Sequence, residues 1–410
     1  MMHSFYRYIG VVACAAMGYA CQAQTLTLEQ CLKVAAEHNM ALRTADAETA
    51  RTRSLQGTAW DVERTELSLA QDPTSGGSPD NAIALSQTIE FPTVYAARHR
   101  QLKAETRVQE SKRNVTATAV RAEITAAYYK LVYQQERVNI LMAHDSLLQR
   151  YADVAQLRYK AGEARQLEWL TATRMVRENR MELEQAKSDM AVGKLDMATA
   201  LGTDISLTPA DSKLVPMCYQ PQHYSWEASA EGQLAQNECV AAQKALRTAQ
   251  NGYAPTITLA LKNQMVIKGW DPYHENRARY AGGNFMGFEV GIGVPLFFGA
   301  TRAKVKAARQ EQQIAQLNMQ RAQWNAQKEY DAAMCRYNTA FNRMQYYNGE
   351  AATDAAETIK LAATEYEQGE IAYTEYVNAL QVDIDVRMRR AEAINDYNQA
   401  VVALQRITGK

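Results

Sequence analysis

Residues 158–172 read RYKAGEARQLEWLTA, and residues 365–379 read EYEQGEIAYTEYVNA. Laid over each other without gaps, the two stretches carry the same residue at five positions: Tyr159 and Tyr366, Gly162 and Gly369, Glu163 and Glu370, Glu168 and Glu375, Ala172 and Ala379. The two stretches lie about half the chain apart. A glycine-centred stretch that occurs twice at this separation predicts that one structural plan is used twice.

The composition favours long, slender helices over thick globular cores. The chain has 410 residues, is rich in Ala, Gln, Glu and Arg, and contains only 9 Pro, 7 Phe and 5 Trp. Its mean hydropathy is −0.41. Lysine plus arginine equal aspartate plus glutamate, 45 against 45, so no net charge attracts nucleic acid. Basic runs with interleaved aromatic residues are absent from the sequence, and we expect no nucleic-acid partner.

The N-terminus has the form of a secretory signal peptide over residues 1–23. Arg7 precedes an apolar stretch over residues 9–20, and small residues at Cys21 and Ala23 bracket a cut before Gln24. The alternative is a short membrane anchor, but the apolar stretch is short for a membrane span. Lipidation of an N-terminal cysteine stays open. The four later cysteines form no C-x-x-C pair, so we expect them to be buried as small apolar residues.

The remaining chain divides at residues 203–225, where three prolines interrupt the helical pattern. This predicts a first repeat over 24–202, a linker over 203–225 and a second repeat over 226–410. In both repeats the order of predicted elements is the same. A helix is followed by a strand, a polar loop, a strand ending in proline, a very long helix, a glycine turn and another helix.

Period-two alternation marks the strands. It runs through residues 83–91, 256–265 and 288–296, and more weakly through 65–69, with apolar side chains on one face only. Such a face has two interpretations. It can be the buried face of an antiparallel sheet that packs on a soluble core, or the outer face of a barrel wall in lipid. The helices carry only narrow apolar stripes, which pack against other helices and leave the strands uncovered, so the barrel wall is favoured. The polar segments 71–81 and 268–284 are then expected to be exterior loops.

Four strands cannot close a barrel, since even small barrels need about eight. The wall therefore predicts an obligate oligomer whose chains pool their strands. The long helices fit this plan, because residues 93–158 contain neither proline nor glycine and residues 300–368 contain only Gly349. Each would be roughly 100 Å long at 1.5 Å per residue. Gly162 and Gly369 then form the tips of two helical hairpins. The alternative is that these are ordinary interhelical turns that contact no partner protein.

The pattern resembles the TolC family of outer-membrane efflux proteins over essentially the whole mature chain. The resemblance rests on the two tip motifs, on the strand-ending Pro92 and Pro295, and on the closing pairs Leu201-Gly202 and Thr408-Gly409. Two departures stand out. The first helix reads HNMALRTA where the family often has proline after the asparagine, and Asn378 stands where many members carry an acidic residue. The stretch SQTIEFPTVYAARHR is most similar to the heavy-metal efflux branch.

The resemblance implies a mainly α fold with a small transmembrane β part. Four strands from each chain of a homotrimer would form a 12-stranded barrel in the outer membrane, continued by a coiled-coil tunnel into the periplasm. The implied function is a passive exit duct of a tripartite efflux or type I secretion-like system in a Gram-negative bacterium. The implied partners are a periplasmic adaptor, an inner-membrane pump of the RND type and outer-membrane lipid. The cargo, whether drug, metal, dye or peptide, stays open.

Within that resemblance, six tip residues are expected to contact the adaptor: Lys160, Gly162, Glu163, Gln368, Gly369 and Glu370. Three residues of the second hairpin are candidate gate residues: Tyr366, Glu375 and Asn378. Glu375 has an alternative as an ordinary solvated helix charge. We expect no catalytic residue, no metal ligand and no cofactor, because no nucleophile elbow, phosphate loop or histidine cluster occurs in the sequence. The alternative function is a secreted or periplasmic coiled-coil scaffold without a pore.

Overall fold

The computed structural model describes residues 24–72, 80–204, 207–266 and 284–409. The predicted signal peptide, with its cysteines, and most of both predicted exterior loops lie outside these residues. The chain forms two compact units, and each draws on both halves of the sequence. The hairpin unit contains the described part of Met1–Asn39 together with Glu123–Cys218 and Asn338–Ala400; the sheet unit contains Met40–Ala122, Tyr219–Tyr337 and the described part of Val401–Lys410. The predicted boundaries of the two repeats stay a prediction.

The sheet unit is built on a four-stranded antiparallel sheet in the order β2-β3-β5-β6. The strands are β2 (Glu66–Asp72), β3 (Asp80–Glu90), β5 (Thr256–Val266) and β6 (Asn284–Gly293). All four strands predicted from period-two alternation are therefore present. The register places Leu67, Leu85, Leu261 and Phe288 in one cross-strand row, because each is paired with the next.

Helices continue the sheet unit beyond the strands. They are α2 (Met40–Leu55), α5 (Ala230–Gln250), α6 (Gly299–Asn348), and the first part of α3 (Pro92–Lys160), with short 3-10 turns η1 (Gln56–Trp60) and η2 (Asn251–Tyr253). Helix α3 begins at Pro92, a favoured first residue because proline lacks the N–H that a helix start leaves unpaired. Tyr224, Trp226, Ala235 and Ala326 form a buried cluster that fixes the end of the linker against α5 and α6.

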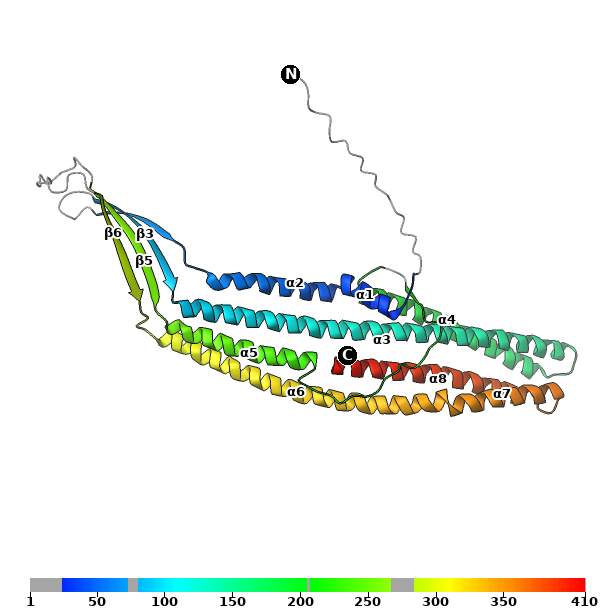
Figure 1. The fold of residues 1–410 in the computed structure, drawn as a ribbon. Helices are drawn as coiled ribbons and strands as arrows, with labels where there is room; N and C mark the ends of the chain where they lie inside the picture. Colours follow the sequence, from blue (N-terminus) through cyan, green and yellow to red (C-terminus); the bar gives the residue numbers. More distant parts are fainter. Residues whose placement is uncertain (1–23, 73–79, 205–206, 267–283, 410) are drawn as a thin grey trace, which may run out of the picture. The chain divides into compact units, whose positions relative to one another are not determined.

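The largest part of the hairpin unit is two antiparallel helix pairs. The second part of α3 runs beside α4 (Gln166–Leu201), and the end of α6 with α7 (Glu350–Gln368) runs beside α8 (Tyr373–Thr408). Both interhelical turns lie at the same end of this unit (Figure 1). Narrow layers of buried side chains hold α3 to α4, such as Val138 and Leu141 against Leu183 and Ala186. This is the narrow-stripe packing that the helical pattern predicted.

The structure corrects the prediction of one continuous first helix. The chain instead forms α1 (Leu28–His38) and α2, which are separated at Asn39. Asn39 has extended backbone angles, φ −61° and ψ 124°, and its amide donates to the carbonyl of Ala200 at 2.8 Å. Because this bond fixes Asn39 outside the helical region, the break forms although the chain has no proline there.

Three further differences concern the linker, the second long helix and the cysteines. The linker contains β4 (Leu207–Pro209), which pairs in parallel with β1 (Gln24–Leu26). The predicted helix over 300–368 is divided at Gly349, whose backbone angles are φ −109° and ψ −99°. Of the described cysteines only Cys31 is buried, whereas Cys218 and Cys335 are exposed, so the prediction of general burial was wrong.

Candidate functional site

Both hairpin tips end their first helix in the same hydrogen-bonded turn. Gly162 and Gly369 have φ of 80° and 77°, in the left-handed region that favours glycine. The N–H of Gly162 donates to the carbonyl of Tyr159 at 3.0 Å, and that of Glu163 donates to the carbonyl of Arg158 at 2.9 Å. The same two bonds recur, residue for residue, in the second turn at 3.1 and 2.9 Å. This is the Schellman arrangement, and it explains the repeated glycine of the two stretches.

The residues predicted to contact a partner are all exposed at these tips. Their charged groups form no ion pair with another described residue. The residues that share this position are Lys160, Gly162, Glu163, Gln368, Gly369 and Glu370. Exposed residues at a hydrogen-bonded turn are available for contact with a second protein.

Four tyrosines, Tyr151, Tyr366, Tyr373 and Tyr376, form what we call the tyrosine cluster, which joins the two hairpins near their tips. Tyr366 stacks on Tyr376 with ring centroids 5.0 Å apart, and the hydroxyls of Tyr151 and Tyr376 are hydrogen-bonded. Burial raises the pKa of Tyr151 well above its usual range, and the bond to Tyr376 adds to this. The cluster therefore connects α3 to α7 and α8 through stacked rings and a hydroxyl–hydroxyl hydrogen bond.

A charged side chain completes this connection. Arg158, near the end of α3, donates from Nη1 to the hydroxyl of Tyr366 at 3.3 Å. Of the three predicted gate residues, Tyr366 thus lies in a contact between the hairpins. Tyr151, Tyr373 and Tyr376 were not predicted from the sequence. The signal available was the run of three tyrosines around the second tip, which no spacing rule linked to Tyr151.

Glu375 and Asn378 have different surroundings from Tyr366. Glu375 is exposed, and its carboxylate accepts from the backbone N–H of Ala372 at 3.1 Å. It therefore caps the start of α8, in the manner of the glutamate of a capping box. Asn378 is exposed one turn further along α8, where it lines a pocket between α8 and α4. The three residues do not form one contact network.

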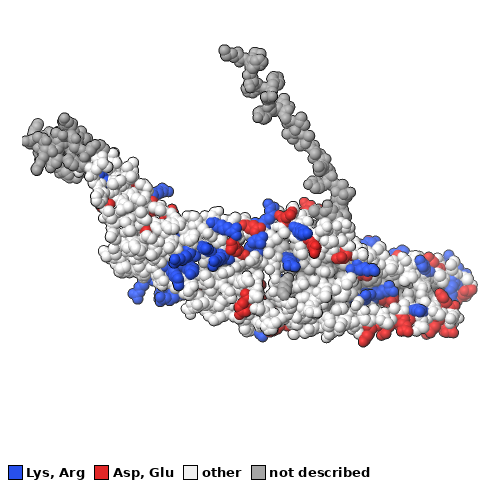
Figure 2. All heavy atoms as spheres, viewed as in Figure 1, with Lys and Arg blue, Asp and Glu red and all other residues white. Residues whose placement is uncertain are grey.

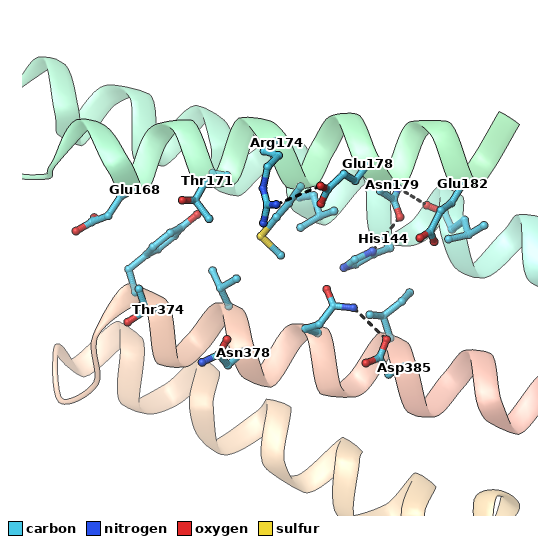
Figure 3. A pocket seen from close by; sticks show the side chains of 18 of the residues that line it. His144, Glu168, Thr171, Arg174, Glu178, Asn179, Glu182, Thr374, Asn378 and Asp385 are labelled. Carbon is cyan, nitrogen blue, oxygen red and sulfur yellow. Dashed lines mark hydrogen bonds and ion pairs between the residues drawn. The ribbon is translucent and has the colours of Figure 1, made fainter. Parts of the chain in front are cut away.

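This pocket, which we call the α4–α8 pocket, has a volume of about 710 Å³ and is also bordered by α3 (Figure 3). Polar and charged residues from α3, α4 and α8 line much of it, among them His144, Glu168, Glu178, Glu182 and Asp385. Burial raises the pKa of Tyr373, at one end of the pocket, to about 12, with smaller contributions from Tyr366 and Glu168. Sequence reasoning placed only Asn378 here and missed the pocket.

The sheet presents the second candidate surface, a large apolar face open to the surroundings. Side-chain exposure along one cross-strand row is 72% for Leu67, 44% for Leu85, 56% for Leu261 and 82% for Phe288. The opposite face carries small or polar residues, and there Lys262 and Glu289 form an ion pair. Figure 2 shows mostly uncharged side chains over the strands, in contrast to the helices. Among the described residues, β2 and β6 each have one neighbouring strand only.

None of the helices in the described ranges is long and apolar enough to cross a membrane. An apolar sheet face with polar residues behind it, in a chain that also forms long helical hairpins, is typical of outer-membrane channel proteins. Comparison with known proteins agrees with this class.

Residues 233–410 match the model of the outer membrane efflux protein family. The second half of the chain is therefore similar to this family, which confirms the predicted resemblance to outer-membrane efflux proteins and agrees with the predicted outer-membrane location. The family is one of channel proteins and not of enzymes. A search of curated protein sequences found no match.

Solved structures with the same fold cover nearly the whole chain. A membrane protein from Pseudomonas aeruginosa is 17% identical with a TM-score of 0.76, and the match covers 93% of both chains. The outer-membrane protein VceC from Vibrio cholerae is 15% identical with a TM-score of 0.72, covering 93% of this chain and 96% of that one. The outer-membrane channel MtrE of Neisseria gonorrhoeae, in its open state, is 16% identical with a TM-score of 0.71, covering 93% and 88%. At these identities the likeness shows the fold.

Proposed function

We propose that three copies of this chain form an outer-membrane exit duct that conducts cargo passively. The observation that carries the proposal is the four-stranded sheet, whose apolar face is exposed and whose edge strands have one neighbour each within the described residues. In lipid, an unpaired strand edge leaves backbone groups without hydrogen bonds, so a membrane sheet must close on itself. Three copies of four strands supply twelve, enough for a barrel with a water-filled interior.

The polar face then lines the interior of the barrel. Lys262 and Glu289 lie on that face, as do Thr88 and Thr258, whose hydroxyls are 3.1 Å apart. Alternation of lipid-facing and water-facing side chains is the pattern of membrane barrels. The long helices of the three chains would continue this interior as a periplasmic tunnel. Energy for export would come from an inner-membrane pump of the RND type, since a passive conduit needs no catalytic group of its own.

The hairpin tips are the proposed docking site for a periplasmic adaptor, and the tyrosine cluster is the proposed latch of the periplasmic entrance. Support for the docking site is the exposure of the six tip residues and the rigid turns that present them. Support for the latch is the set of bonds from Tyr151 and Arg158 on α3 to Tyr376 and Tyr366 on the second hairpin. Breaking these bonds would release one hairpin from the other.

The test is the native mass of the protein after envelope fractionation and extraction in mild detergent, followed by conductance in a planar bilayer. A trimer from the outer-membrane fraction that forms discrete conducting channels is the expected result. A monomer or dimer in the soluble periplasmic fraction would contradict the duct and support the coiled-coil scaffold. A trimer that never conducts, even when the latch bonds are removed, would contradict the proposed conduction but not the proposed trimeric assembly.

A further inference from the structure

The starting point is a histidine whose tautomer is fixed by its neighbours. His144 of α3 is only 7% exposed, and its Nδ1 lies 3.0 Å from Oδ1 of Asn179 on α4. The Nδ2 of Asn179 donates to the carbonyl of Leu141 at 3.2 Å. Because a backbone carbonyl can only accept, the Asn179 amide must turn its NH₂ toward Leu141 and its oxygen toward His144. His144 therefore carries its proton on Nδ1, and Nε2 of the neutral ring is an acceptor.

This acceptor has no partner. The Nε2 of His144 is buried and forms no hydrogen bond with any described residue. His144 also lines the α4–α8 pocket, and Figure 3 shows its ring between α4 and α8. A buried acceptor without a donor is unfavourable, and most such groups in folded proteins are satisfied. A purely structural role would be served better by an apolar side chain, so the position points to a hydrogen-bond donor that enters the pocket.

The charge of the pocket indicates which kind of donor it accepts. Glu182 and Asp385 lie at the same end of the pocket as His144 (Figure 3). Glu182 forms no ion pair with a described residue, and Asp385 accepts only the neutral amide of Gln381, at 3.0 Å. Further along, Glu178 is paired with Arg174 at 3.4 Å. The His144 end is therefore negative, and it favours a cation.

The remaining lining of this end is apolar. Leu141, Ile384 and Met388 border the pocket beside the polar groups. Among the residues that the structure describes, no group of three or more His, Cys, Asp or Glu side chains could hold a metal ion. A donor that carries positive charge and also a short hydrocarbon chain fits this combination better than a metal ion does.

We propose that the α4–α8 pocket binds a primary alkylammonium group. The ammonium donates a hydrogen bond to Nε2 of His144, the carboxylates of Glu182 and Asp385 balance its charge, and its alkyl chain lies against Ile384 and Met388. Two sources can supply this chemistry: a small amine in the periplasm, or a lysine side chain of a docked protein. The second source rests on the proposed function, since it makes the pocket part of the adaptor-docking surface.

The binding test uses the full-length protein in detergent with n-butylamine, which is protonated at neutral pH, and with 1-butanol as the uncharged counterpart. Calorimetric titration should show binding of n-butylammonium and at least tenfold weaker binding of 1-butanol. His144→Phe keeps a ring but removes the acceptor, and it should weaken n-butylammonium binding at least fivefold. His38→Phe, an exposed histidine of α1 whose Nδ1 lies 3.1 Å from the carbonyl of Val34, is the matched control and should change nothing.

Because His144→Phe replaces a buried polar residue, two exposed variants keep the test decisive if it fails to fold. Glu182→Gln and Asp385→Asn should each weaken n-butylammonium binding several-fold without altering the circular dichroism spectrum or the native mass. Unchanged affinity in these variants, or equal affinity for the amine and the alcohol, would overturn the proposal.

A second arm separates the two sources. Carbodiimide treatment of intact cell envelopes joins a carboxylate to a contacting lysine as an amide, and mass spectrometry identifies the linked residues. A link from Glu182 or Asp385 to a lysine of another protein would assign the site to a docked lysine. Binding of the amine without such a link would assign it to a small amine. The proposed function is judged separately by conductance of the wild-type trimer, which needs no amine.

Discussion

At the residue scale, glycines with positive φ differ in what surrounds them. Comparing two of them distinguishes the cost of the left-handed backbone from the cost of a steric clash. A Cβ added at Gly202, φ 72°, would lie 2.7 Å from the backbone carbonyl oxygen of His38. A Cβ added at Gly409, φ 78°, would meet nothing within 4 Å. Both positions share the left-handed cost, about 1 kcal/mol for a residue with a side chain. Only Gly202 adds a clash with backbone, which cannot move as a side chain can.

We therefore expect Gly202→Ala to lower the free energy of unfolding by about 2–4 kcal/mol, as the left-handed cost and overpacking combine. Gly409→Ala should lower it by about 1 kcal/mol. Thermal unfolding in detergent, followed by circular dichroism, measures the difference. Equal shifts for the two variants would show that the contact between Gly202 and α1 does not constrain the fold.

Two substitutions of Glu375 distinguish its role as a helix cap from the effect of its negative charge. Glu375→Gln keeps an oxygen that can accept from the N–H of Ala372, whereas Glu375→Ala removes it. We expect the alanine variant to be less stable by about 1 kcal/mol, a typical value for a lost cap, and the glutamine variant to be close to wild type. If the three copies of Glu375 also form a ring in the pore, both variants should reduce cation selectivity in reversal-potential measurements. A change in stability without a change in selectivity would leave only the cap.

The tyrosine cluster predicts a loss of stability in alkali. The pKa of Tyr373 is raised by burial from its ordinary value of 10.0 to about 12. Between these pH values the unfolded chain binds fewer protons than the folded chain, so the free energy of unfolding falls as the pH rises from 10 to 12. Below pH 10 both states keep the proton and this group adds no pH dependence. Tyr373→Phe should flatten that decline in urea titrations, and an unchanged slope would contradict the assignment.

At the scale of elements, the sequence predicted what depends on local pattern. Period two located the four strands of the sheet, and the absence of proline and glycine located the long helices. It could not locate the break at Asn39, because that break depends on a hydrogen bond to Ala200, far away in the sequence. Nor could it find the α4–α8 pocket, because His144, Glu182 and Asp385 come from three helices and look like ordinary helix residues in one dimension.

The two faces of β3 give the proposed membrane wall a direct test. Leu85 lies on the exposed apolar face, while Ser86 lies on the opposite face, paired with Glu66 and Ala260. Leu85→Arg should lower the free energy of unfolding in the membrane by about 2–4 kcal/mol, which is the cost of an arginine that faces lipid near the bilayer midplane. Ser86→Arg should be tolerated because its charge would face water and Glu66. Heat-resistant trimer in outer-membrane fractions is the measurement, and equal yields of the two variants would argue against a lipid-facing wall.

At the scale of the whole molecule, the proposed duct combines a closed wall with an entrance that can be held shut, and the two depend on different units of the chain. The wall requires strand edges to be completed by other copies. The entrance depends on bonds within each copy, from α3 to the second hairpin. Loss of the latch should therefore change conduction without changing assembly.

The double variant Tyr151→Phe with Tyr376→Phe tests this separation, because it removes both hydroxyls of one latch bond and keeps both rings. A single hydrogen bond contributes about 1 kcal/mol, and three copies of the latch act on one entrance, so the open state should become several-fold more populated. Tyr128→Phe is the control, since its hydroxyl donates to Asp211 at 2.9 Å and not to the tyrosine cluster. Planar-bilayer recordings should show higher mean conductance for the double variant and wild-type conductance for the control. Equal conductance in all three trimers would mean that the cluster stabilises the hairpins without governing the entrance.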